Sequence, residues 1–138
     1  MEGFEVFPHT ADVGLSVHGK TLPALFENAA LGMMTLLSQP GKFRPLTRIP
    51  FDLKANSRET LLVDWLHEIL YYFSVKHVGF SGFSVQMTGD FSLRAEAWGE
   101  KIDPARHPVL REIKAVTYHD LKIEFTEHDY RVKIIFDI

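Results

Sequence analysis

The side chains with the clearest chemistry in this chain are carboxylates near its two ends. Asp12 lies in the segment HTADVG (residues 9–14), and Asp137 is followed by Ile138 with its terminal carboxylate. Two anions one residue apart repel each other, so a cation nearby is favoured. Carboxylate and carbonyl oxygens are the ligands of hard cations such as Ca²⁺ or Mg²⁺. The alternatives are a turn in which Asp12 binds backbone amides and a strand end with solvated charges.

A basic side chain and two further candidates lie in the segment EIKAVTYH (residues 112–119). Lys114 stands among apolar neighbours, where it either reaches water along its stem or points at carboxylates or at a partner's phosphate or acidic group. Thr117 and His119 follow it, and His9 lies near the first carboxylate. Strand-end packing is the alternative role of His119. The sequence has no helical pair of histidine ligands and no nucleotide-binding or nucleophile motif.

Composition excludes several classes of function. A length of 138 residues predicts one domain over residues 1–138 that folds without disulfides. The absence of cysteine excludes thiolate chemistry and Cys-ligated zinc. A net charge of -3 without a basic run disfavours direct binding of nucleic acid. No apolar run approaches the ~20 residues that span a bilayer, so we expect a cytoplasmic protein without a membrane partner.

Hydrophobic periodicity predicts the elements that must position these residues. Helical spacing predicts helices over residues 22–37 and 61–73, and alternation predicts strands at residues 4–7, 13–17, 49–55, 83–87, 91–97, 113–118, 121–125 and 130–138. Thr21 fits as the N-cap of the first helix. The N-cap of the second helix is either Asn56, in a capping box with Glu59, or Ser57. Residues 88–90 predict a hairpin turn, and residues 103–108 an ordered surface loop.

This order of elements predicts an α+β fold with two helices packed on a mostly antiparallel sheet. The strand-helix-strand pattern occurs twice, which indicates two similar modules. If the first and last strands pair in one sheet, they bring Asp12 close to Asp137.

Six segments together resemble the archease family over essentially the whole chain. They are HTADVG (9–14), GKT with FENAALGM (19–21 and 26–33), ETLLVDWLHEILY (59–71), IDPARHP (102–108), IKAVTYH (113–119) and VKIIFDI (132–138). Each segment is weak alone, but six in order at similar positions are specific. Ile102 stands where an aromatic residue is common, and residues 40–47 are proline-rich, but neither departure touches the candidate site.

The resemblance implies a fold in which one strand-helix-strand-strand module is inserted into another. It also implies an accessory protein and not an enzyme. Archeases promote the guanylylation and multiple turnover of the RtcB-type RNA ligase in tRNA splicing and RNA repair, and they can broaden its use of nucleotides. The ligase would be the partner, and tRNA would be met only through it. By this similarity Asp12, Asp137 and Ile138 would bind a divalent metal, Ca²⁺ or else Mg²⁺ or Mn²⁺, and Lys114 would be the functional basic residue.

Two other classes of function are compatible with the sequence. In a stand-alone metal-dependent phosphoester hydrolase, Asp12 and Asp137 would hold the metal, and His9 or His119 would be the general base. A chaperone-like protein would recognise exposed segments through apolar helix faces, although those faces are needed for the core. The sequence leaves the oligomeric state open.

Overall fold

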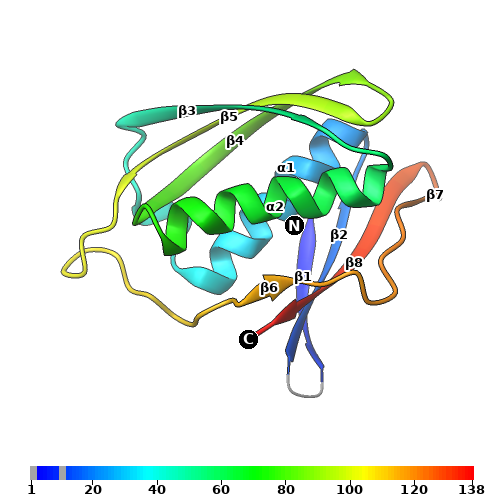
Figure 1. The fold of residues 1–138 in the computed structure, drawn as a ribbon. Helices are drawn as coiled ribbons and strands as arrows, with labels where there is room; N and C mark the ends of the chain where they lie inside the picture. The colour runs from blue at the N-terminus through cyan, green and yellow to red at the C-terminus, as the bar shows by residue number, and fades with distance from the viewer. Residues whose placement is uncertain (1–2, 10–11) are drawn as a thin grey trace.

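Two helices pack between two antiparallel sheets, as expected for the predicted α+β class (Figure 1). The structure is a computed structural model that describes residues 3–9 and 12–138, and for residues 8 and 9 it describes the main chain alone. Among the described residues, no helix is long and apolar enough to span a bilayer.

The larger sheet is built from both ends of the chain. Its strands are ordered β1 (Phe4–His9), β2 (Asp12–Gly19), β8 (Asp129–Asp137) and β6 (Ala115–Val116), and β7 (Glu124–Thr126) pairs with the first part of β8. The last strand therefore lies between β2 on one side and β6 and β7 on the other. It pairs with β2 and not with β1, so the expected pairing of first and last strands is wrong by one strand.

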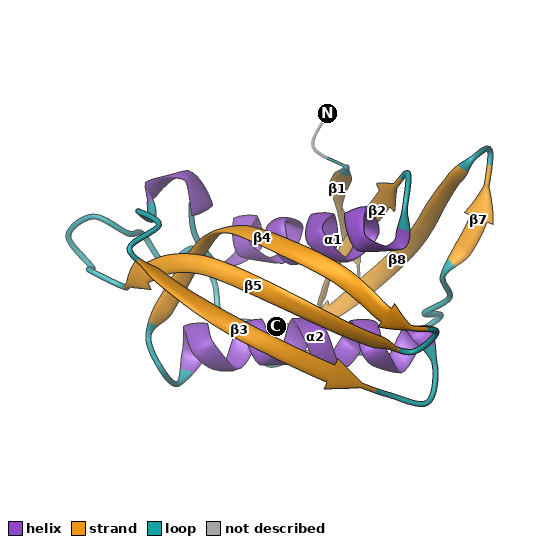
Figure 2. Ribbon diagram, turned by 90° about the horizontal axis from the view of Figure 1, so that it is seen from above, coloured by secondary structure: helices purple, strands orange, loops and turns teal. Residues whose placement is uncertain are grey.

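The smaller sheet comes from the middle of the chain. Its strands are ordered β3 (Thr47–Lys54), β5 (Ser92–Lys101) and β4 (Val78–Gly89), and it lies across both helices (Figure 2). Helix α1 (Leu22–Leu37) precedes the short 3-10 helix η1 (Pro40–Lys42), and α2 (Arg58–Ser74) joins β3 to β4. The unit β3-α2-β4-β5 is therefore inserted between the two parts of the larger sheet.

Side-chain caps fix where the two helices begin. Thr21 and Ser57 are the N-caps, and each side chain accepts a hydrogen bond from the backbone N–H three residues further on. Ser57 rather than Asn56 is thus the cap of α2. Glu59, expected in a capping box with Asn56, instead accepts a bond of 2.9 Å from the backbone N–H of Ile123. This carboxylate fastens the chain between β6 and β7 to the start of α2.

Trp65 joins the helices to the smaller sheet. Its fully buried indole donates from Nε1 to the backbone oxygen of Phe26 in α1 at 3.0 Å. The ring makes edge contacts with Phe51 and Phe83, whose centroids lie 5.3 and 5.9 Å away. An aromatic side chain whose polar atom is satisfied can be buried without the cost of an unpaired donor, so Trp65 stabilises the centre of the core.

Two predicted strands and one turn differ from the structure. β6 and β7 have only two and three residues, shorter than predicted at 113–118 and 121–125. The chain between them turns sharply, with Asp120 at φ 50°, and leaves the edge of β8. The turn of the second hairpin lies at residues 90–91, because β4 continues through a bulge between Met87 and Gly89.

The loop at residues 103–108 is irregular, as predicted, but it is anchored inside the protein. Glu100, 5% exposed, accepts hydrogen bonds from the side chains of Arg106 at 2.8 Å and Arg44 at 3.0 Å. His107 is 1% exposed, lies 3.2 Å from this carboxylate and stacks on Phe43, so the prediction of a surface loop is wrong for this residue. The bonds from Arg106 and then Arg44 hold the pKa of Glu100 far below its usual range.

Glu100→Gln should remove this anchor in a pH-dependent way. The pKa of Glu100 is lower in the folded protein than in the unfolded chain, so its stabilising contribution is present above about pH 4.3 and is lost as the pH falls toward the folded-state pKa. We expect the Tm of the variant to be lower at neutral pH and its difference from the natural protein to shrink below about pH 4. Thermal unfolding followed by circular dichroism measures this. Glu96→Gln, at an exposed carboxylate of the same strand, is the control. An equal loss of Tm in Glu100→Gln at every pH would contradict a stabilising role of the charged Glu100 carboxylate.

Candidate functional site

Asp12 and Asp137 lie directly opposite each other on neighbouring strands. In the register of β2 with β8, Asp12 pairs with Asp137 and Val13 pairs with Phe136. Residues that face each other in an antiparallel pair project from the same side, with Cβ atoms about 4.5–5.5 Å apart. Val13 and Phe136 are buried in the core, so the two carboxylates project from the outer face, the side away from the helices.

Two further strands flank this pair. On one side the main chain of His9 in β1 is opposite Asp12, whereas the side chain of His9 lies outside the part of the chain that the structure describes. On the other side Ala115 of β6 is opposite Asp137, and the N–H of Lys114 donates to the backbone oxygen of Asp137 at 2.7 Å. We call these four opposed residues, from His9 across to Ala115, the carboxylate row.

The carboxylate row is open to solvent at the end of the sheet. Asp12 is half-buried, whereas Lys114, Asp137 and Ile138 are exposed. Like charges directly opposite each other destabilise a strand pair, and an added cation relieves that repulsion. Among the residues that the structure describes, no group of three His, Asp or Glu side chains is arranged to hold a metal. Besides the two aspartates, a main-chain oxygen of Ile138, adjacent in the chain, is available as a further ligand for a cation.

Thr117 and His119 lie beside the carboxylate row and not in it. The backbone N–H and the hydroxyl of Thr117 both donate to the backbone oxygen of Ile135, at 3.0 and 2.9 Å. The same hydroxyl accepts a bond of 3.3 Å from the N–H of His119. His119 is exposed, with its Nε2 3.3 Å from the Asp120 carboxylate. Thr117 thus supports the main chain, and His119 lies above the neighbouring part of the outer face.

His67 is a site residue that sequence reasoning missed. It lies on α2, and its Nε2 accepts a hydrogen bond of 3.1 Å from the backbone N–H of Val116. Because Nε2 is the acceptor, the ring proton is on Nδ1. The bond fastens β6, and with it Lys114, to the helix layer. In the sequence, His67 is a histidine on the flank of an apolar helix face, and nothing in that pattern indicates a bond to the backbone of Val116.

His67→Ala should loosen β6 without altering the carboxylates. The N–H of Val116 loses its acceptor, and an unsatisfied buried N–H costs about 1–3 kcal/mol. We expect amide hydrogen exchange at Val116 to be at least about tenfold faster, because about 1.4 kcal/mol corresponds to a factor of ten. NMR-detected exchange measures it. His67→Gln keeps a side-chain acceptor and should show a smaller change; unchanged exchange in the alanine variant would contradict the positioning role.

Comparison with known proteins finds relatives over nearly the whole chain. The model of the Archease protein family matches residues 4–138. The protein archease of Methanosarcina acetivorans is 40% identical, over 98% of this chain and 95% of its own. That of Sulfurisphaera tokodaii is 34% identical over the whole of both chains. The chain therefore belongs to the archease family.

Solved structures resemble the whole fold. The solution structure of Methanobacterium thermoautotrophicum protein 1598 is 30% identical with a TM-score of 0.81 and covers 100% of both chains. The crystal structure of an archease from Thermotoga maritima is 20% identical with a TM-score of 0.70, and it covers 97% of this chain and 96% of its own. At that identity the second likeness concerns the fold alone.

Proposed function

We propose that this chain is an accessory protein that activates an RtcB-type RNA ligase in tRNA splicing and RNA repair. It would promote the guanylylation and multiple turnover of the ligase and broaden its use of nucleotides, without a catalytic activity of its own. Membership in the archease family supports this role. The observation that carries it is the carboxylate row, where Asp12 and Asp137 oppose each other at an open sheet end. An open row can be completed by a partner's surface, whereas catalytic sites usually enclose their substrate.

A divalent cation, Ca²⁺ or else Mg²⁺ or Mn²⁺, fits the donors of this row. Asp12, Asp137 and an oxygen of Ile138 would hold it, since all-oxygen donor sets suit these ions. When bound, the cation supplies positive charge with coordination positions left for oxygen ligands of the partner. Lys114, exposed beside the row, would place a point charge on a phosphate or an acidic group of the ligase. tRNA would be contacted only through the ligase, in keeping with the net charge of -3.

Metal binding should depend on Asp137. The stability of an Asp137 variant without metal should also reveal the repulsion between the carboxylates of Asp12 and Asp137. A ligand at 100 times its Kd stabilises the folded state by about 2.7 kcal/mol, so Ca²⁺ should raise the Tm. For Asp137→Asn we expect no such rise, whereas without metal the variant should be more stable by about 0.2–1 kcal/mol, because one of two opposed charges is gone. Calorimetry with Ca²⁺, Mg²⁺ and Mn²⁺ measures both effects. Asp52→Asn, at an exposed aspartate of β3, should keep the full rise; an undiminished rise in Asp137→Asn would exclude this site.

Ligase activation should depend on the same row. With limiting RtcB-type ligase, GTP and a divalent metal, we expect this protein to increase ligase guanylylation and the number of ligations per ligase. Asp12→Ala and Lys114→Ala should each lower that stimulation about tenfold or more, since hydrogen bonds to charged groups contribute about 1.5–3 kcal/mol. Lys101→Ala, at an exposed lysine of β5, should stimulate normally.

Two further samples sharpen this assay. A few residues appended after Ile138 displace its carboxylate, and normal stimulation by that variant would remove the chain-end oxygen from the site. The protein with metal but without ligase should not hydrolyse a phosphoester such as p-nitrophenyl phosphate. Turnover there, lost in Asp12→Ala, would favour a metal-dependent hydrolase instead.

A further inference from the structure

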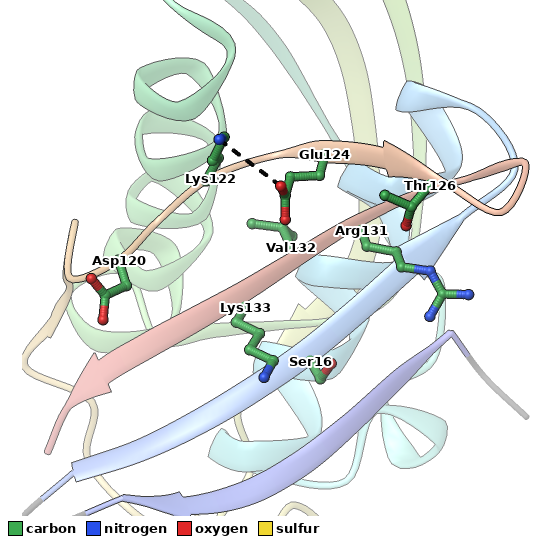
Figure 3. A pocket seen from close by; sticks show the side chains of 8 residues that line it. All are labelled: Ser16, Asp120, Lys122, Glu124, Thr126, Arg131, Val132 and Lys133. Atoms are coloured by element: carbon green, nitrogen blue, oxygen red, sulfur yellow. Dashed lines mark ion pairs between the residues drawn. The ribbon is translucent and has the colours of Figure 1, made fainter.

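The outer face of the larger sheet carries a hollow beside the carboxylate row. It measures about 160 Å³ and is lined by Phe7, His119, Asp120, Lys133 and Ile135. A second hollow of about 350 Å³ adjoins it along β8, and Asp120 and Lys133 line both (Figure 3). We call the first the Phe7 hollow. It lies next to the carboxylate row, because Phe7 is opposite Gly14 and Gly14 is opposite Ile135, two residues along each strand from that row.

The floor of the Phe7 hollow is flat and apolar. The ring of Phe7 lies over Gly14, where a Cβ atom would be only 2.2 Å from the ring carbon Cζ, so any larger residue would push the ring away. Ile135 continues the floor and is 6% exposed although it projects from the outer face. Phe7 itself is half-buried, which leaves part of the ring accessible. Such an aromatic surface is suited to stacking against another planar ring.

The rim of the Phe7 hollow is polar and carries both signs of charge. The ammonium of Lys133 lies over the Phe7 ring, 6.0 Å from its centroid, and would move aside for a stacked base. Asp120 and His119 also line the hollow, where the chain bends away from β8 between β6 and β7. A lysine donor and a carboxylate acceptor around an apolar floor match the edge of a heterocyclic base, which presents both acceptors and donors.

The spacing to the carboxylate row identifies the class of ligand. Ile135 and Lys133 lie two and four residues before Asp137 on an extended strand, hence about 7 and about 14 Å away at about 3.4 Å per residue. One nucleotide can bridge such a span, with its phosphate at a cation on the carboxylate row and its base on Phe7. We propose that the Phe7 hollow binds the base of a nucleotide whose phosphate is held at that row. This inference rests on the proposed function, because the carboxylate row supplies the phosphate end.

Two sources could supply this nucleotide: a free nucleotide or the terminal residue of an RNA strand. Both present a planar base next to a phosphate, and the apolar floor of the Phe7 hollow does not distinguish one source from the other. A protein side chain from a partner would also fill an apolar hollow, but it would need no phosphate and no cation. The test therefore has to separate base, phosphate and partner.

NMR titration of the isotopically labelled protein in the presence of Ca²⁺ provides this test. We expect GMP to shift the amide of Gly14 and the methyl groups of Ile135, with ribose 5-phosphate and inorganic phosphate shifting only signals of the carboxylate row. Phe7→Ala should weaken GMP binding about fivefold or more, since stacking on an aromatic side chain is worth about 1–3 kcal/mol per base. Phe91→Ala, at an exposed phenylalanine in the hairpin turn of the smaller sheet, is the matched control. A short single-stranded RNA ending in a phosphate tests the second source by the same signals.

The outcomes separate this inference from the proposed function. Shifts at Gly14 and Ile135 that need the base and disappear in Phe7→Ala support it, whether GMP or the RNA end gives the stronger effect. Shifts identical with inorganic phosphate, or no shifts at saturating GMP, overturn it, even if the ligase is activated normally. In the ligase assay Phe7→Ala should alter the ratio of GTP to ATP use. If Phe7→Ala leaves this ratio unchanged and shows the same GMP shifts as the natural protein, the inference is overturned as well. The hollow would then be assigned to a partner's side chain.

Discussion

The register between β2 and β8 is the constraint on which the rest of the structure depends. Val13, Leu15 and Val17 of β2 face the helices together with Phe136, Ile134 and Val132 of β8, and all six are buried. A slip by one residue would turn this set outward, at about 1.5–3 kcal/mol for each large apolar side chain exposed. The same register therefore fixes which side chains project outward, among them Asp12 opposite Asp137. The position of the carboxylate pair follows from the packing of the core and not from any attraction between the two residues.

The inserted module and the helices hold the weak edge of this sheet. β8 has a continuous partner in β2, but on its other edge it has only the short strands β6 and β7. Two side chains of α2 support the chain there: His67 binds the backbone of Val116, and Glu59 binds the backbone of Ile123. Trp65, on the same helix, connects α2 to α1 and the smaller sheet. The placement of Lys114 thus depends on a helix that belongs to the inserted module.

Periodicity in the sequence was sufficient for most of the fold. The helix faces, the N-cap of the first helix and the long strands have strong local signals, and all of them appear in the structure, whereas the cap of the second helix was left open between Asn56 and Ser57. The lengths of β6 and β7 could not be predicted from the sequence. The alternation of residues 113–125 indicates on which face of the chain each side chain lies, but not where the backbone is hydrogen-bonded to β8. The burial of His107 was also hidden, since its ring stacks on Phe43 and lies 3.0 Å from the backbone oxygen of Lys42, both remote in sequence. Asp12 and Asp137 could be singled out by residue type, but their direct opposition needed the strand register.

The two acidic ends of β8 show how the same residue type is used differently. Asp129, at the first residue of the strand, is nearly buried and meets Lys20 at 3.1 Å and Arg131 at 3.6 Å. The hydrogen bond from Lys20 lowers the pKa of Asp129, so this carboxylate is neutralised within the chain and stabilises the sheet. At the last residue of the strand, Asp137 is exposed and the residue directly opposite is a second carboxylate. Asp129 is thus paired with opposite charges within the chain, whereas Asp137 faces a carboxylate of the same sign. A cation from outside would relieve repulsion at Asp137, whereas at Asp129 it would compete with Lys20.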